Sequence, residues 1–182
     1  IRNEIPDALI SVDTWRSGVA RTLHNRFGIH MINDISAGES DPQMFSTVAK
    51  LNLAYVMMHM QGTPETMQDS PQYDNVLADL LQFFGKKIYK LKKLEVNDVI
   101  IDPGFGFGKT TEQNFQLLRE LDAFAILELP LMVGLSRKSM IYKSLESNPT
   151  EALTGTTAAH MAALLGGASI LRVHDVKEAI ET

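Results

Sequence analysis

Residues 98–110, DVIIDPGFGFGKT, join a short apolar run to a glycine-rich turn, and this change of pattern decides the fold. Asp102 ends the apolar run, and glycines then alternate with Phe105 and Phe107. Glycine reaches backbone conformations that other residues avoid, so such a turn can bring the main chain close to a ligand. The stretch therefore predicts a buried strand that delivers a carboxylate to a glycine loop.

Five further apolar runs repeat this arrangement along the chain: ALISV at 8–12, IHMIN at 29–33, AYVMM at 54–58, PLMVG at 130–134 and ASILRV at 168–173. A polar or charged group lies at or just past the end of each run, in order Asp13, Asn33, His59, Lys138, and Arg172 with His174. Stretches with helical periodicity separate the runs. Alternating strands and helices predict parallel strands joined by right-handed crossovers.

The strand ends favour a closed barrel. A doubly wound open sheet gathers its site at one switch point, whereas a (β/α)8 TIM barrel uses the carboxyl ends of all its strands. We therefore expect an α/β fold, a (β/α)8 TIM barrel of which this chain supplies about six βα units. Residues 1–182 contain no repeat or linker and are expected to form a single domain that is incomplete at its N-terminus.

Helices are expected wherever apolar residues recur at helical spacing. The first should follow Asp13 and end at Gly28, and the second should start with Asp41 as N-cap and Pro42 in the first turn. Five more are expected at 72–94, 111–122, 136–146, 150–166 and from about 175.

Composition is that of an ordinary globular protein and excludes several classes. The 182 residues are 45% hydrophobic and 21% charged, and the net charge of −5 argues against non-specific binding of nucleic acid. The absence of cysteine excludes disulfides and thiolate metal sites and fits a cytoplasmic location. No apolar stretch approaches the roughly 18 residues that a membrane helix needs.

The glycine loop does not fit either common nucleotide motif. A Walker A loop would need glycine at Pro103, and a dinucleotide fingerprint would need glycine at Lys109. The remaining alternatives are a flexible loop or a site in which Asp102 accepts hydrogen bonds from a planar ligand. In the second case Phe105 or Phe107 could stack on that ligand.

Two cationic runs indicate an anion site. In GLSRKS at 134–139, Ser136 is a candidate N-cap, and Arg137 and Lys138 would oppose the dipole of the following helix unless an anion is bound. In RVHD at 172–175, alternation places Arg172 and His174 on one side of a strand end, where they could hold a phosphate or pyrophosphate. Asp175 is expected to cap the next helix. The alternative for either run is an exposed basic turn.

Asp13 and Asn33 at the other strand ends suit a nitrogen-rich heterocycle, because a carboxylate accepts hydrogen bonds while an amide both donates and accepts. Met58 fits either core or ligand wall. His59 has no HxxxH or carboxylate partner that would indicate zinc.

The order of these motifs strongly resembles the dihydropteroate synthases. ISVDT, INDIS, MHMQGTPETMQ, DPGFGFGKT, VGLSRKS and RVHDV carry the resemblance, which covers nearly the whole chain. It implies a transferase of folate biosynthesis that joins p-aminobenzoate to 6-hydroxymethyl-7,8-dihydropterin pyrophosphate and releases pyrophosphate. Sulfonamides would compete at the p-aminobenzoate site, and a cytoplasmic homodimer is implied.

The resemblance also implies roles for individual residues. Asp13, Asn33, Asp102 and Lys138 match the polar pterin contacts, and Asp13, Asp102 and Lys138 would act in catalysis. Met58 and Gly134 match the walls of the pterin site. The pyrophosphate contacts match Arg172 and His174, and the p-aminobenzoate contacts match Phe107 and Ser139.

The sequence departs from the family pattern at its N-terminus. The two mobile loops that follow the family's first two strands are absent, and the first of them supplies the asparagine implied as a Mg²⁺ ligand. The expected metal ligand therefore lies before Ile1. Two alternatives stay open: another pterin-binding barrel enzyme of the methyltetrahydrofolate methyltransferase type, which would need no pyrophosphate clamp, and a non-catalytic relative.

Overall fold

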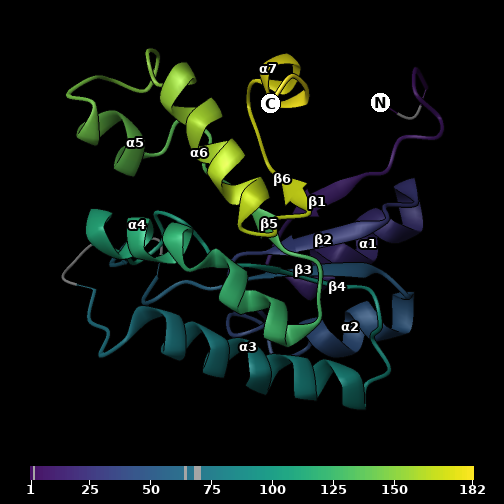
Figure 1. Ribbon diagram of the computed structural model, residues 1–182. Coiled ribbons are helices and arrows are strands. Elements are labelled where there is room, and N and C mark those ends of the chain that lie inside the picture. The colour runs from purple at the N-terminus through teal and green to yellow at the C-terminus, as the bar shows by residue number, and fades with distance from the viewer. Residues whose placement is uncertain (2, 64, 68–70) are drawn as a thin grey trace. The chain divides into compact units, whose positions relative to one another are not determined.

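Strands and helices alternate along the chain, as the apolar runs predict. The computed structural model describes residues 1, 3–63, 65–67 and 71–182, which include six strands, β1 to β6 (Figure 1). These described residues divide into two compact units, one of residues 1–58 and 84–101 and one of residues 59–83 and 102–182. None of the helices in the described ranges is long and apolar enough to cross a bilayer.

The first unit contains a parallel sheet. Its strands β1 (Ser11–Asp13), β2 (Met31–Asp34) and β3 (Ala54–Met58) are hydrogen-bonded in sequence order. Register pairs Asp13 with Asn33 and Asn33 with Val56, so these strands end at one edge. β4 (Val99–Asp102) is next in the sheet order, and the Tyr55 N–H donates to the Asp98 carbonyl over 2.8 Å. Tyr55 to Met58 are buried, as expected for a parallel strand covered on both faces.

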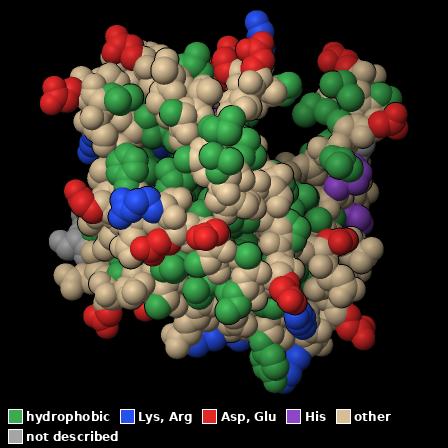
Figure 2. All heavy atoms as spheres, in the orientation of Figure 1, with side chains coloured by type: hydrophobic (Ala, Val, Ile, Leu, Met, Phe, Trp, Pro, Cys, Tyr) green, Lys and Arg blue, Asp and Glu red, His purple; other side chains and the backbone are tan. Residues whose placement is uncertain are grey.

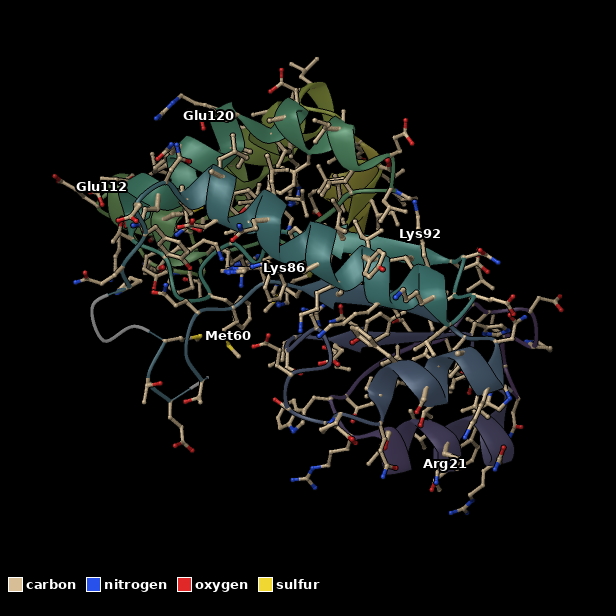
Figure 3. The ribbon with its side chains drawn as sticks, turned by 90° about the horizontal axis from the view of Figure 1, so that it is seen from below. Arg21, Met60, Lys86, Lys92, Glu112 and Glu120 are labelled. Carbon is tan, nitrogen blue, oxygen red and sulfur yellow. The ribbon has the colours of Figure 1, made fainter. Side chains whose placement is uncertain are left out.

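Helices α1 (Ser17–Phe27) and α2 (Met44–Leu51) lie side by side in this unit, and the Arg21 side chain of α1 (Figure 3) donates to the Thr47 hydroxyl of α2 over 3.4 Å. Gly28 ends α1 as predicted, with a φ of 58° and its N–H bonded to the His24 carbonyl. The predicted N-cap of α2 is wrong. The Asp41 carboxylate instead accepts hydrogen bonds from the N–H groups of Ser17, 2.7 Å away, and Gln43, 2.9 Å away, so α2 starts at Met44.

Helix α3 (Val76–Lys93) has the amphipathic pattern that the sequence predicts. Phe84, Ile88 and Leu91 are buried. Lys86 and Lys92 lie on its exposed side, as Figure 3 shows, whereas Lys87 is buried and forms a 3.0 Å salt bridge with Glu39. Lys and Arg side chains gather along the lower edge of the surface in Figure 2, where α3 runs in Figure 1.

The second unit contains β5 (Met132–Val133) and β6 (Ile170–Leu171), which pair in parallel. Its helices are α4 (Thr111–Arg119), η1 (Leu121–Leu127, a 3-10 helix), α5 (Ser139–Ser144), α6 (Leu153–Leu165) and α7 (Val176–Ile180). A capping box between Thr110 and Gln113 starts α4 directly after the glycine loop. The last two strands and α5 are shorter than predicted.

A buried carboxylate fixes the turn after β2. Asp34 accepts hydrogen bonds from the N–H and hydroxyl of Ser36, from the N–H of Gly38 and from the hydroxyl of Tyr55, 2.6 Å away. Burial, followed by the charge of Asp34, raises the pKa of Tyr55 well above its ordinary value, so the phenol stays protonated as a donor. The pair ties β2 to β3 next to Asn33.

Replacing Tyr55 with phenylalanine should lower the free energy of unfolding by about 1–3 kcal/mol, because a buried carboxylate loses a donor while the ring volume is retained. The exposed Tyr89 provides the matched control, and Tyr89→Phe should stay within about 0.5 kcal/mol of the unsubstituted protein. Urea titration measures both. Equal stabilities for the two variants would contradict this account of the Asp34 turn.

Candidate active site

Asp102 is the last residue of β4 and is only 5% exposed. Its Oδ1 accepts the Gly104 N–H over 2.8 Å, and the neighbouring His59 N–H donates to its main-chain carbonyl. Burial raises the pKa of the carboxyl, whereas the Gly104 N–H and the positive charges of Lys109, Lys138 and Arg172 oppose this rise. The strand end thus carries a carboxylate that depends on its neighbours to stay ionised.

Three glycines give the loop after Asp102 its shape. Gly104, Gly106 and Gly108 have φ values of 71°, 79° and 61°, a region that side chains disfavour. A Cβ on Gly108 would lie 2.6 Å from the carbonyl oxygen and 2.9 Å from the nitrogen of Gln61. The Gly108 carbonyl accepts the Tyr73 hydroxyl over 2.7 Å. The glycine loop is therefore in contact with the segment that follows β3.

The two phenylalanines of the loop have different surroundings. Phe105 is 1% exposed and belongs to the core, so the suggestion that it stacks on a ligand is wrong. Phe107 is half-buried, and the Lys138 Nζ lies 4.4 Å from the centre of its ring, a cation–π geometry. Burial lowers the pKa of Lys138, opposed by the charge of Asp102. Phe107 and Lys138 thus lie together, as the predicted p-aminobenzoate and pterin contacts would require.

Lys109, to which the sequence pattern gives no role, is only 3% exposed and lies on the inner side of the loop. Its Nζ contacts the carbonyls of Gly104 and Phe107, each 3.0 Å away, and the His59 Nδ1, 3.1 Å away. Burial lowers the pKa of Lys109 to about 7, although the charge of Asp102 raises it. The sequence of the glycine loop does not reveal that this side chain turns inward.

His59 is part of the same buried cluster. Its ring meets Phe83 edge-on at 4.9 Å between centres, and burial, with the charge of Lys109, lowers its pKa to about 3. The neutral ring can therefore accept a hydrogen bond from Lys109 at Nδ1. The ranges 1, 3–63, 65–67 and 71–182 contain no group of three His, Cys, Asp or Glu side chains that could hold a metal ion.

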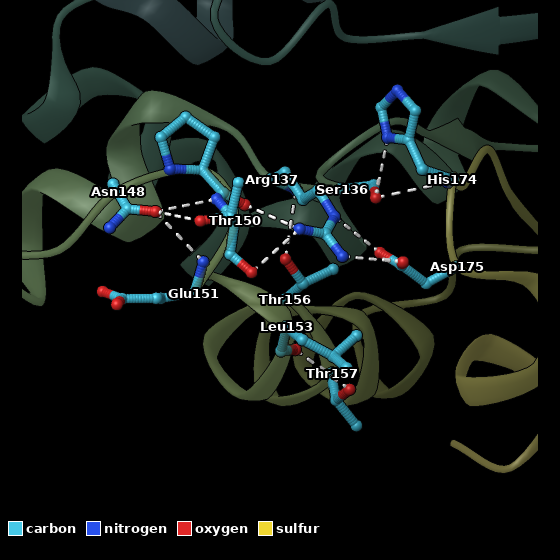
Figure 4. A network of polar contacts seen from close by, with 11 residues as sticks. Ser136, Arg137, Asn148, Thr150, Glu151, Leu153, Thr156, Thr157, His174 and Asp175 are labelled. Atoms are coloured by element: carbon cyan, nitrogen blue, oxygen red, sulfur yellow. Dashed lines mark hydrogen bonds and ion pairs between the residues drawn. The ribbon is translucent and has the colours of Figure 1, made fainter.

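A salt bridge joins the loop that follows β5 to the loop that follows β6 (Figure 4). The Arg137 guanidinium binds the Asp175 carboxylate through two hydrogen bonds of 2.9 and 2.8 Å and also donates to the carbonyls of Pro149 and Thr150. Because Asp175 neutralises Arg137, that cation needs no bound anion. Asp175 occupies the N-cap position of α7, but its side chain caps no N–H, so the predicted capping bond is wrong.

Ser136 is not the N-cap of α5. Lys138 holds that position, and α5 begins with the half-buried Ser139. The Ser136 hydroxyl instead lies 2.9 Å from the His174 Nδ1 and 3.3 Å from the His174 main-chain nitrogen (Figure 4). The side chains of Arg172 and His174 are exposed, and a Cβ on Gly134 would lie 4.0 Å from the Arg172 Cβ. The two loops are therefore joined next to the predicted anion contacts.

The predicted residues of the first unit form a pair. Asn33 is buried, and its Nδ2 donates to the Asp13 Oδ1 over 3.0 Å. The Asn33 Oδ1 has no hydrogen-bond partner among the described residues. A buried amide oxygen without a partner is costly, so it fits a ligand N–H. Met58 is also buried, at the end of β3. Pro64 and Gln68 of the MHMQGTPETMQ motif lie outside the described residues.

Alanine at Gly108 should lower the free energy of unfolding by about 1–3 kcal/mol, because the added Cβ overlaps the main chain of Gln61 and the left-handed φ is strained. Gly85 in α3 has open space around its Cβ position, so Gly85→Ala should stabilise the helix by about 0.5–1 kcal/mol. Guanidinium titration compares the two. A Gly108→Ala variant as stable as Gly85→Ala would contradict the proposed contact.

Comparison with known proteins agrees with this arrangement. The family model described as pterin binding enzyme matches residues 1–174. Dihydropteroate synthase of Escherichia coli is 43% identical over 174 residues, which are 94% of this chain and 61% of that protein. The chain thus spans about three fifths of the length of such curated relatives.

Solved structures give the same result. Yersinia pestis dihydropteroate synthase with a sulfonamide drug has a TM-score of 0.91 and 42% identity, covering 96% of this chain and 64% of that one. The Xanthomonas albilineans enzyme in complex with 7,8-dihydropteroate has a TM-score of 0.89 and 34% identity, covering 99% of this chain and 69% of that one. The chain therefore belongs to the pterin-binding enzyme family and groups with its dihydropteroate synthases.

Proposed function

We propose that the protein carrying this chain is a dihydropteroate synthase that joins p-aminobenzoate to 6-hydroxymethyl-7,8-dihydropterin pyrophosphate with release of pyrophosphate. The observation that carries the proposal is Asp102, a buried carboxylate at a strand end with three cations opposing its protonation. A carboxylate accepts two parallel hydrogen bonds, which matches the amino and ring N–H edge of a pterin. The relatives bound to 7,8-dihydropteroate and to a sulfonamide support the same ligands here.

Further pterin contacts are proposed for Lys138 and Gly134, and in the first unit for Asp13, Asn33 and Met58. The partnerless Asn33 Oδ1 supports a ligand N–H at that position. Loss of pyrophosphate from the CH₂ group would leave a cation delocalised into the dihydropterin ring, and the carboxylates of Asp13 and Asp102 would stabilise that charge as it develops. The C–O bond breaks with both electrons leaving on the pyrophosphate, and the neutral amine of p-aminobenzoate then forms the C–N bond with its lone pair. The nitrogen is positively charged after this step and loses one proton to solvent or to the departing pyrophosphate, so little base is needed before the attack.

For p-aminobenzoate we propose contacts with Phe107 and Ser139, the site where sulfonamides would compete. The ring of Phe107 offers an apolar face beside the Lys138 ammonium. Pyrophosphate is assigned to Arg172 and His174. When the Ser136 hydroxyl donates to the His174 Nδ1, the ring N–H is left on Nε2, where it can donate to a phosphate oxygen.

We also propose a cytoplasmic homodimer. Helix α6 exposes Met161, Leu164 and Leu165, and it contains several small residues that permit close helix packing. Mg²⁺ stays an expectation from the family.

Replacing Asp102 with alanine should weaken pterin binding by about 2–5 kcal/mol, because donors that the pterin buries lose their acceptor. Titration calorimetry with a pterin ligand measures the loss, and the exposed Asp122 on η1 provides a control variant, Asp122→Ala, that should bind normally. Near-native affinity in Asp102→Ala would refute the assignment.

Substitution of Arg172 tests the anion site. Arg172→Ala should raise KM for the pterin pyrophosphate about tenfold but change the affinity for a pterin without pyrophosphate much less, because solvent screens the effect of the exposed Arg172 on Asp102. Arg172→Lys keeps the charge but loses the planar fork, so it should recover only part of that loss. Steady-state kinetics combined with calorimetry separates the two effects. Equal KM values for all three proteins would show that the pyrophosphate contacts lie elsewhere.

A further inference from the structure

We infer that Lys109 is a positioning residue: it fixes the 103–108 loop from inside and supplies the Asp102 carboxylate with a buried counter-charge. This inference rests on the proposed function, because it assigns Lys109 to the same pterin and p-aminobenzoate site. Lys109 contacts no proposed ligand itself, and it acts through Asp102 and Phe107.

The geometry of the ammonium group supports the loop-fixing role. Its Nζ bonds to the carbonyl of Gly104 at the start of the loop and to the carbonyl of Phe107 near its end, each 3.0 Å away, and to the His59 Nδ1 at 3.1 Å. The His59 carbonyl lies further away, at 3.4 Å, so four acceptors surround the three N–H donors of the ammonium. One side chain therefore sets the separation of the two loop ends and with it the position of the Phe107 ring.

The burial of the charge supports the electrostatic role. Lys109 is only 3% exposed and burial lowers its pKa to about 7, so its ammonium carries a costly buried charge below that pH, the range in which a carboxylate takes up its proton. An apolar side chain of equal length would fill the same space without that cost. Three charged or titratable groups face Lys109: Asp102 from the end of β4, Lys138 from the residue before α5, and His59 from the segment after β3. His59 is neutral because burial holds its pKa at about 3, so Asp102 is the anion within this cluster.

Asp102 is also faced by Lys138 and Arg172, but these cations differ from Lys109 in exposure. Lys138 is half-buried beside Phe107, and Arg172 is exposed. Solvent screens exposed charges such as that of Arg172, and a bound pyrophosphate would attract both the Lys138 and the Arg172 side chain. The buried Lys109 is shielded from these changes, so its effect on Asp102 persists whether or not the anion is present.

The test compares Lys109→Met, Lys109→Arg and the control Lys86→Met in the native full-length protein. Lys86 lies exposed on α3 (Figure 3), outside the proposed site. Pterin affinity is measured by calorimetry from pH 5 to 8, and KM for p-aminobenzoate by steady-state kinetics. Asp102 must be ionised to accept the pterin N–H groups, and loss of a nearby cation raises its pKa. In Lys109→Met, pterin binding should therefore be lost at a pH about 1 unit higher, and KM for p-aminobenzoate should rise about tenfold.

Lys109→Arg separates the two roles. Its guanidinium keeps the charge but cannot place three donors from one nitrogen on the same acceptors. We expect an unchanged pH dependence of pterin binding together with a raised KM for p-aminobenzoate. A merely structural lysine would lower stability without moving the pH dependence. Should Lys109→Met fail to fold, as judged by circular dichroism, Lys109→Arg decides alone: a wild-type KM in the folded variant overturns the inference.

The outcomes also separate this inference from the proposed function. If the unsubstituted protein binds pterin and turns over both substrates, but Lys109→Met matches Lys86→Met in pH dependence and KM, only the inference fails. If the unsubstituted protein neither binds pterin nor forms dihydropteroate, the proposed function is overturned and the inference with it.

Discussion

The carboxylate of Asp102 imposes the constraint on which the second unit depends. A charged group at a buried strand end is stable only if it is paired or hydrogen-bonded. The Gly104 N–H contributes one hydrogen bond, and Lys109, Lys138 and Arg172 contribute positive charge. These groups come from the glycine loop, from the segment before α5 and from the end of β6, so the ionisation of one residue links three separate parts of the sequence.

The conformation of the glycine loop meets this constraint. Three positive φ values turn its main chain so that the carbonyls of Gly104 and Phe107 converge on the Lys109 ammonium. Larger residues are excluded at Gly108 by the main chain of Gln61. The loop therefore needs the conformational freedom of glycine to reach this shape, and contacts from outside the loop then hold each glycine in place.

The sequence predicts the positions of the strands better than it predicts the hydrogen-bond partners of polar side chains. Parallel strands are buried on both faces, so continuous apolar runs such as VII at 99–101 identify them without further information. Polar residues near helix starts have several possible partners at similar cost. Ser136 bonds to His174, 38 residues away, and Asp41 bonds to Ser17, 24 residues away, instead of capping their own helices. Lys109 is hidden for the same reason: whether a lysine turns inward depends on acceptors that the fold supplies.

The contrast between buried and exposed groups fits the proposed reaction. In the proposed reaction Asp102 would recognise the pterin edge, and because this carboxylate is buried, its hydrogen bonds would need little reorganisation. Pyrophosphate is a leaving group, and a product held too tightly would limit turnover. Arg172 and His174 are exposed, and their attraction to an anion is screened by solvent. A site that holds one substrate with buried charges and the leaving group with exposed ones can be selective for the pterin while still releasing the anion.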